Sequence, residues 1–404
     1  MHRLRRLFSR RGDERLDRDV IVLGIIAFFV MLGFGVVIPV LPVYVRSFDV
    51  GFVEIGAVVS AFALFRLIAT PFVGRLVDRG GERTILAIGI GIVAVSSGLV
   101  GIAGSYAEVL MLRGAGGIGS AMFSVSAMTL LLSTAAPESR ARSVGFYQGG
   151  FLVGGMAGPA VGGVLAAFSL RAPFFFYAAT LIVAGIIGLV LLRKPTAVIT
   201  ADAPPQIPLG VVLRDRRFVA ACVANFAQGW GSMGARSALI PVLVVEVLRG
   251  TSAWTGVAFA IAAVVQTLCL GPAGRFVDRV GRRPAMVGAF TAAAILLMAI
   301  SVVPNFAVLT VLLCLYGAAA AFMGTAPAAS LGDAAGARNA RPVAIFSAFS
   351  DAGAVVGPLV VGALLDSFSW PIAFGSAAAL MLVAAAVSVT MPRRISGDRE
   401  VTLL

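Results

Sequence analysis

The sequence predicts an all-α polytopic membrane protein with twelve transmembrane helices in two pseudo-symmetric six-helix bundles. The 404 residues are 59% hydrophobic and only 13% charged, and the mean hydropathy is +0.99. A soluble domain could not cover so much apolar surface with so few charges. A charged stretch that begins at Gly74 returns at Gly274, 200 positions later, between long apolar runs. Such a repeat indicates two homologous bundles fused in series.

The apolar runs give the helices in order, because about twenty apolar residues cross a bilayer as a helix. The expected spans are 20–44, 52–75, 83–104, 106–134, 141–166, 171–193, 218–246, 253–277, 284–303, 305–332, 342–365 and 368–391. They divide the chain into a basic tail (1–19), an N-terminal bundle (20–193), a linker (194–217), a C-terminal bundle (218–391) and a second tail (392–404). Within the linker, Ile207 to Arg217 could form a short surface helix.

Basic residues gather in the segments that twelve spans place on one side of the membrane. They are Arg3 to Arg18, Arg79 and Arg83, Arg140 and Arg142, Arg279 to Arg283, Arg338 and Arg341, and Arg393 and Arg394. The positive-inside rule puts this side, and both termini, in the cytoplasm of a bacterial inner membrane. The same rule accounts for the net charge of +13, so no nucleic-acid partner is expected.

Proline and glycine mark two helices as bent. The first span ends with Gly33, Gly35, Pro39 and Pro42, and the seventh has a similar run from Gly234 to Val242. A proline inside a spanning helix removes a backbone hydrogen bond, so we expect a deformable segment in both helices.

Glycines four residues apart line the fifth span at positions 150, 154, 158 and 162. The eleventh span carries a thinner version with Gly353, Gly357 and Gly362. A stripe of this kind lets another helix approach closely. Tight packing alone would explain it, and sliding contacts between bundles would use the same feature.

The repeated loop resembles the signature G-x-L-a-D-r-x-G-r-k of the major facilitator superfamily of secondary transporters. The first copy matches at Gly74, Leu76, Asp78, Arg79, Gly81 and Arg83, with Glu82 departing from the usual basic residue. The second copy matches at Gly274, Asp278, Arg279, Gly281, Arg282 and Arg283, with Phe276 for leucine. The resemblance implies two bundles that rock about a central site, and it makes these residues a conformational latch.

The fifth span also resembles a pattern of the drug:proton antiporter branch, g-x8-G-x3-GP-x2-GG. The matching residues are Gly145, Gly154, Gly158, Pro159, Gly162 and Gly163. The fourth span matches that family's signature at Arg113, Gly117 and Gly119, with Gly116 for the usual glutamine. Val30 stands where drug exporters often have the helix 1 aspartate. The resemblance implies a proton-coupled antiporter and leaves its proton-carrying carboxylate open.

Four charged residues fall inside spans, where each costs about 2.5–3.5 kcal/mol on insertion scales. They are Arg66, Arg113, Arg236 and Asp351. Three cations against one anion require carbonyls and water as partners, or a substrate that is partly anionic.

Polar residues on the seventh span are candidates for substrate contact. Asn225, Gln228, Ser232 and Arg236 lie within about 80° of one face of an α-helix, and Arg113 begins a similar row on the fourth span. In the family, helices 1, 4, 7 and 10 line the central cavity. The expected substrate-binding residues are therefore Arg113, Asn225, Gln228, Ser232, Arg236, Phe34 and Tyr316. Hydrogen bonding between helices is the alternative role.

Arg66 and Asp351 lie at similar depth on helices 2 and 11, which face each other in the family fold. We hypothesise that they form an interbundle lock that protonation of Asp351 releases; a static pair is the alternative. Asp78 would accept from free N–H groups at the start of helix 11, and Asp278 from those of helix 5.

These observations predict a proton-coupled exporter of small amphipathic molecules that works by rocker-switch alternating access. The alternatives are a proton-coupled importer of an anionic metabolite, a lipid flippase and a non-transporting membrane sensor. The sequence has no P-loop, metal-ligand cluster or nucleophile–base pair. We therefore expect no enzymatic activity, no metal and no cofactor, with the proton gradient as energy source. The expected partners are a small-molecule substrate, protons and the bilayer, and the expected state is a monomer.

Overall fold

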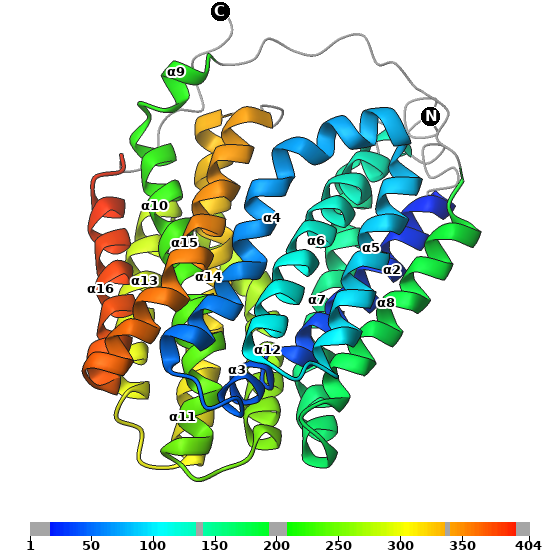
Figure 1. Cartoon of the computed structure of the whole chain (residues 1–404). Helices are drawn as coiled ribbons and strands as arrows, with labels where there is room; N and C mark the ends of the chain where they lie inside the picture. The colour runs from blue at the N-terminus through cyan, green and yellow to red at the C-terminus, as the bar shows by residue number, and fades with distance from the viewer. Residues whose placement is uncertain (1–16, 135–139, 194–207, 336–339, 393–404) are drawn as a thin grey trace, which may run out of the picture.

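The computed structural model describes residues 17–134, 140–193, 208–335 and 340–392, and within these ranges every regular element is a helix. Figure 1 shows two groups of long helices side by side. In the described part of the chain, eleven helices are long and apolar enough to cross a membrane. The twelfth crossing consists of three consecutive pieces, α10, η1 and α11. The predicted fold class is confirmed.

The N-terminal bundle begins with a helix capped by Asp17, whose side chain accepts from the Asp19 N–H at 2.9 Å. Its helices are α2 (Arg18–Val37), α3 (Leu41–Arg46), α4 (Phe52–Gly80), α5 (Glu82–Val100), α6 (Tyr106–Thr134), α7 (Arg140–Phe168) and α8 (Ala172–Leu191). One continuous apolar core joins them, with Phe174, Leu23 and Leu130 among its fully buried side chains.

The C-terminal bundle also begins at an aspartate cap, Asp215, which accepts from the Arg217 N–H at 2.7 Å. Its helices are α10 (Arg216–Trp230), η1 (Gly231–Leu239), α11 (Ile240–Glu246), α12 (Ser252–Arg279), α13 (Arg282–Ile300), α14 (Phe306–Ala335), α15 (Ala340–Ser367) and α16 (Trp370–Val389). A second apolar core, containing Phe259, Phe290 and Phe374, holds this bundle together.

The expected bends in the first and seventh spans are confirmed, and they correct two expected ranges. The span 20–44 is broken between Val37 and Leu41, around Pro39, which has no N–H to donate. The span 218–246 changes at Gly231 into a π-helix that continues to Leu239. A π-helix has hydrogen bonds from i to i+5 and is uncommon outside functional sites.

The glycine stripes let other helices approach closely, as expected, and most of these contacts lie within a bundle. On α7, a Cβ at Gly154 would lie 2.8 Å from the Leu32 nitrogen, and one at Gly158 would lie 2.6 Å from the Gly35 Cα of α2. On α15, a Cβ at Gly357 would lie 2.8 Å from the Trp230 Cα of α10. Both stripes therefore pack the first helix of their bundle against the fifth.

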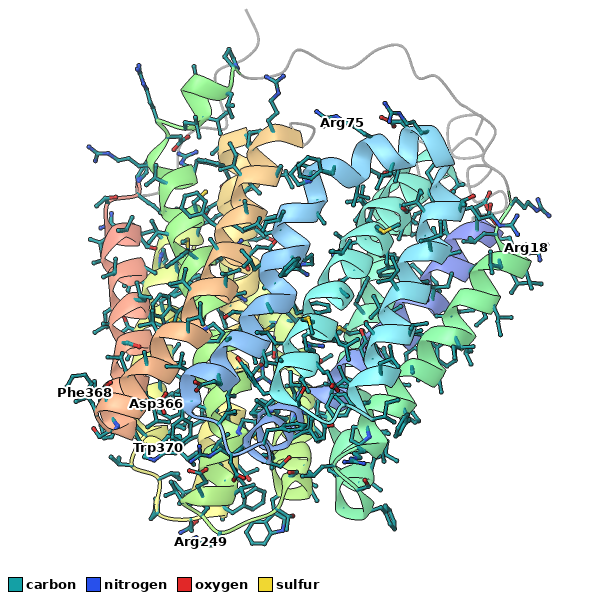
Figure 2. All side chains as sticks on the ribbon, in the orientation of Figure 1. Arg18, Arg75, Arg249, Asp366, Phe368 and Trp370 are labelled. Atoms are coloured by element: carbon teal, nitrogen blue, oxygen red, sulfur yellow. The ribbon has the colours of Figure 1, made fainter. Side chains whose placement is uncertain are left out.

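The molecule has two ends, which Figure 2 labels with residues from both bundles. We call the end that carries Arg18, Arg75 and the turns at Gly81 and Gly281 the basic face. We call the end that carries Asp49, Arg249 and Asp366 the far face.

The structure also bears on the linker and tails. The linker contains one short helix, α9 (Leu209–Val212), whereas Arg216 and Arg217 already belong to α10. The short helix therefore ends earlier than expected. Tail residues 1–16 and 393–404, linker residues 194–207 and Arg338 lie outside the described residues.

Candidate functional site

The two bundles are joined at mid-height by an ion pair between α4 and α15. The structure places the Arg66 guanidinium against the Asp351 carboxylate, which accepts a hydrogen bond from it. The side chains are 36% and 20% exposed, so the pair is only partly removed from solvent. Its partners come from different bundles, so the pair must break if α4 and α15 separate at this depth.

Closer to the far face, a carboxylate of one bundle caps a helix of the other. Asp366, near the end of α15, accepts from the Phe52 N–H at 2.9 Å and from the Val53 N–H at 2.8 Å. These are free N–H groups at the start of α4, whose N-cap Gly51 offers no side-chain cap. A carboxylate is favoured there by the hydrogen bonds and by the helix dipole. Sequence reasoning missed this cap, because the partners of Asp366 are main-chain groups.

A second ion pair closes the far face between the short helices. Arg46 Nε lies 2.9 Å from Glu246 Oε1, and these are the last residues of α3 and α11. The Arg46 guanidinium also lies 4.8 Å from the centre of the Phe52 ring. Sequence reasoning missed this pair because both residues stand at uncertain ends of expected spans.

A further contact near the far face is between α7 and α12. A Cβ at Gly163 would lie 2.8 Å from the Ala253 carbonyl oxygen and 3.1 Å from the Gly256 Cα. Only glycine allows these backbones to approach so closely. The last glycine of the α7 motif therefore serves the interface between bundles, while Gly154, Gly158 and Gly162 pack against α2 of their own bundle.

Contacts of this kind do not extend to the basic face. A Cβ at Gly74, Gly271 or Gly274 would meet no atom within 4 Å. In Figure 1, α4 bends away from α15 toward the basic face, and Pro71 lies inside α4 before its last turns. Proline is a common cause of such kinks. The bundles therefore touch at the far face and separate toward the basic face.

The expected cap of α15 by Asp78 is not formed among the described residues in this conformation. Asp78 is exposed and has no hydrogen bond or ion pair within the described ranges, so it does not cap α15. Asp278 Oδ1 lies 3.5 Å from Nη1 of Arg282, which belongs to the same turn. Because α4 bends away from α15 at this face, Asp78 is out of contact with the helix start that it was expected to cap.

The other signature residues have local roles. Gly81 and Gly281 have φ values of 78° and 119°, a region that favours glycine, which explains their place in both copies. Arg83 donates to the Leu189 carbonyl, and Arg283 donates to the Met391 carbonyl at 3.2 Å. Each ties the turn to the last helix of its bundle. Arg79 and Arg279 are exposed.

Arg113 lies inside the N-terminal bundle rather than on the expected cavity wall. It is 7% exposed, and its guanidinium lies 4.5 Å from the centre of the Phe62 ring. It lines a small space with Ser96 of α5 and Tyr177 of α8. Phe34 completes this aromatic group, with ring centres 5.7 Å from Phe62 and 6.4 Å from Tyr177. In this conformation Arg113 is screened from a substrate between the bundles.

Arg236 occupies a comparable place in the C-terminal bundle. Its guanidinium lies 5.2 Å from the centre of the Phe259 ring of α12. Tyr316 of α14 is buried, and its hydroxyl lies 3.3 Å from the position of a Cβ on Gly231 in η1. Each bundle thus has an arginine over an aromatic ring, of which Arg113 is buried and Arg236 is half-buried.

The expected polar stripe on the seventh span is interrupted. The Asn225 side chain donates to the Phe346 carbonyl of α15 at 2.7 Å, whereas Arg236 points to α12. Gln228 lies near α14, 3.9 Å from the position of a Cβ on Gly324, and Ser232 is half-buried in η1. The π-helix changes the turn per residue after Trp230, so spacing in an α-helix no longer places these residues on one face.

Comparison with known proteins agrees with this architecture. The family model described as "Major Facilitator Superfamily" matches residues 23–265 and 224–401. Over 180 residues the chain is 32% identical to the quinolone resistance protein NorA of Staphylococcus aureus. Over 168 residues it is 33% identical to multidrug resistance protein 1 of Bacillus subtilis. These matches span about half of either chain, namely 45% of this one and 46% of NorA, and 42% and 43% for the second relative.

Solved structures share the fold at low identity. A bacterial homologue of the human lysosomal transporter Spinster, in an inward-facing and occupied conformation, has a TM-score of 0.77 at 16% identity, with 92% of this chain and 95% of that chain covered. The nucleoside transporter NupG has a TM-score of 0.72 at 15% identity, with 93% of this chain and 99% of that chain covered.

Proposed function

The chain belongs to the Major Facilitator Superfamily and is a membrane transporter rather than an enzyme, and on that premise we propose that it exports small amphipathic molecules in exchange for protons. The similarity to NorA and to multidrug resistance protein 1 supports an efflux role. The glycine motif of α7 supports antiport, since its last glycine lies at the interface between bundles. We further propose a monomer in a bacterial plasma membrane, with the basic face in the cytoplasm.

The observation that carries the proposal is the Arg66–Asp351 ion pair. It lies where the bundles stop touching, and each bundle supplies one partner. A neutral Asp351 would hold Arg66 less tightly, so a proton bound there would bias the equilibrium between the two conformations of the cycle. The proton gradient would thus drive transport without a metal or a cofactor.

The test uses proteoliposomes with an imposed pH gradient and a fluorescent lipophilic cation. For Asp351→Asn we expect proton-driven movement of the cation to fall about 5- to 150-fold, the usual range of coupling between two sites. Exchange of the cation down its own gradient should continue, which separates lost coupling from a misfolded protein. Asp49→Asn removes the same charge from an exposed loop and should transport normally. Equal coupling in wild type and Asp351→Asn would contradict the proposal.

A second candidate, transport of an anionic metabolite, is favoured by Arg236. Within the described ranges this half-buried guanidinium contacts an aromatic ring and has no carboxylate partner. A substrate carboxylate or phosphate could supply that partner. Gradient-driven movement of an organic anion, and not of the cation, would select this candidate.

A further inference from the structure

The C-terminal bundle has a cavity of about 740 Å³ at the basic face. Its walls come from the start of α10, the turn between α12 and α13, and the ends of α14 and α16. Its charged lining residues are Arg217, Arg282, Arg283 and Asp333. All of them belong to one bundle, so the cavity is separate from the interface that the proposed transport cycle uses.

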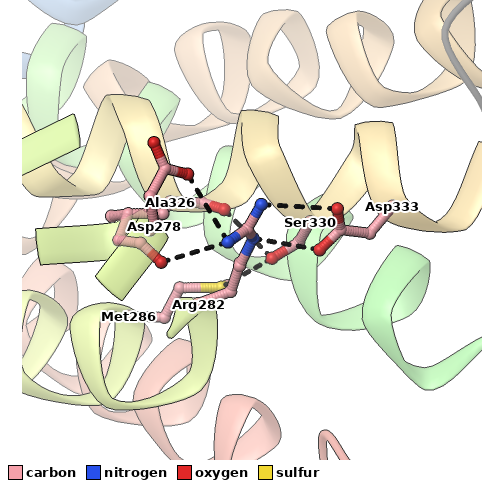
Figure 3. Close-up of polar contacts among 7 residues, drawn as sticks. Asp278, Arg282, Met286, Ala326, Ser330 and Asp333 are labelled. Carbon is pink, nitrogen blue, oxygen red and sulfur yellow. Dashed lines mark hydrogen bonds and ion pairs between the residues drawn. The ribbon is translucent and has the colours of Figure 1, made fainter. Parts of the chain in front are cut away.

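The acids near this cavity are already engaged by one arginine. Arg282 Nε lies 3.0 Å from Asp333 Oδ2, and its Nη1 lies 3.5 Å from Asp278 Oδ1; Figure 3 shows Arg282 between the two carboxylates. Arg283 donates to a carbonyl, that of Met391. The Arg217 guanidinium has no hydrogen bond or ion pair with any described residue. Two half-buried arginines therefore line the cavity without a carboxylate partner among the described residues.

Two further features fit an anionic group that carries apolar chains. The helix α13 starts at this cavity, and its N-cap Gly281 provides no side-chain cap for the first N–H groups. The remaining lining is largely apolar and includes Pro284, Val287 and Val389. A small inorganic anion would use the arginines alone, whereas an amphiphile would use both kinds of surface.

The repeat provides an internal comparison. Asp19 and Arg217 are each the second residue of the first helix of a bundle, and Glu82 and Arg282 are each the first residue of the helix after the signature turn. Arg83 and Arg283 are equivalent, and Ser133 stands 200 positions before Asp333. The N-terminal set thus has two acids and one arginine, and the C-terminal set has three arginines and one acid. The positive-inside rule applies equally to both bundles, so it does not explain why only the C-terminal set is mainly basic.

We propose that this cavity, lined by Arg217, Arg282 and Arg283, binds the phosphate head group of an anionic membrane lipid. Basic pockets between helices at the cytoplasmic side are suited to such head groups. Arg217 and Arg283 bind the phosphate, and Arg282 holds Asp333 so that its charge does not oppose binding. The apolar residues of the lining contact the lipid beyond its head group.

Native mass spectrometry of the purified full-length chain in detergent tests this site, with phosphatidylglycerol or phosphatidylcholine added. We expect one phosphatidylglycerol to bind in preference to phosphatidylcholine. Its affinity should fall on the order of tenfold or more in the double variant Arg217→Gln/Arg283→Gln, since two favourable charges are lost. The control Arg18→Gln/Arg75→Gln removes two exposed arginines from the same face (Figure 2) and should bind like wild type.

Two results would overturn the proposal. If the affinity for phosphatidylglycerol fell equally in the pocket and control variants, net charge, and not this cavity, would attract the lipid. Displacement of the lipid by low millimolar inorganic phosphate would assign the cavity to a free anion. Arg217→Asp, which places an acid where the N-terminal bundle has Asp19, gives a single-site version of the test. Unchanged elution and melting in phosphatidylcholine and detergent would show that the variants fold.

Discussion

At the far face a carboxylate from the end of α15 meets the free N–H groups at the start of α4, whereas at the basic face the carboxylate near the end of α4 meets solvent. The two acids, Asp366 and Asp78, lie near opposite ends of the same antiparallel pair of helices. Each helix start offers free N–H groups, and among the described residues only the start of α4 binds a carboxylate from the other bundle. The comparison suggests that the conformation depends on which end of this pair is capped.

The largest effect is expected from filling the closest backbone contact at the far face. Any Cβ at Gly56 would collide with the Pro358 carbonyl of α15, and overpacking of this kind costs about 1–3 kcal/mol. We expect Gly56→Leu to hold the far face open and to reduce transport about tenfold or more. Gly74→Leu, where a Cβ meets no atom within 4 Å, should leave the present conformation intact.

The distances can be measured by electron–electron resonance between spin labels. Ile102→Cys and Val302→Cys give an exposed label on each bundle at the far face, at 63% and 68% exposure. Arg75→Cys and Arg275→Cys give a second pair at the basic face. Cys222, Cys269 and Cys314 are first replaced by serine. If Gly56→Leu left the distance between positions 102 and 302 unchanged, the close approach at Gly56 would not control closure.

A smaller effect is expected from removing the cap. Asp366→Ala leaves the N–H groups of Phe52 and Val53 without an acceptor from the chain, a loss of about 1 kcal/mol. The far-face label pair should then show a second, longer distance populated about fivefold more than in wild type. Asp366→Asn, which keeps one acceptor oxygen, should give an intermediate population. Identical distance distributions in wild type, Asp366→Ala and Asp366→Asn would show that the cap does not control closure of the far face.

The smallest effect is expected at Arg46 and Glu246. Their side chains are 39% and 35% exposed, and such pairs contribute about 0.2–1 kcal/mol. A double-mutant cycle with Arg46→Gln and Glu246→Gln, read from the same label populations, should give a coupling energy of about 0.5 kcal/mol that falls with added salt. A coupling above 2 kcal/mol would make this pair, and not the cap, the main closure of the far face.

The sequence predicted most of the fold because hydropathy, repeat and proline placement are local signals. It predicted the number of crossings, the two broken helices and the close approach of another helix at the glycine stripes. The interbundle hypothesis for Arg66 and Asp351 came from equal depth in a bundle of known arrangement, and the structure places the two in contact. Their role in proton coupling stays a prediction.

Other parts of the site had no signal in the sequence. The partner of Asp366 is backbone, which any residue other than proline provides. The stripe on the seventh span failed because η1 departs from the 100° per residue of an α-helix. Arg113 was expected between the bundles, but its side chain turns into its own bundle toward Phe62, and helix spacing does not fix that choice.

The far-face cap places unequal constraints on mutation. Asp366 binds the main chain of α4, so this contact does not depend on which side chain stands at position 53. Neutral drift can therefore alter α4 here without loosening the cap, as long as proline is avoided. At position 366 only an acid supplies two charged acceptors. In an alignment of relatives that share this closure, we expect variation at position 53 and restriction to acidic residues at position 366.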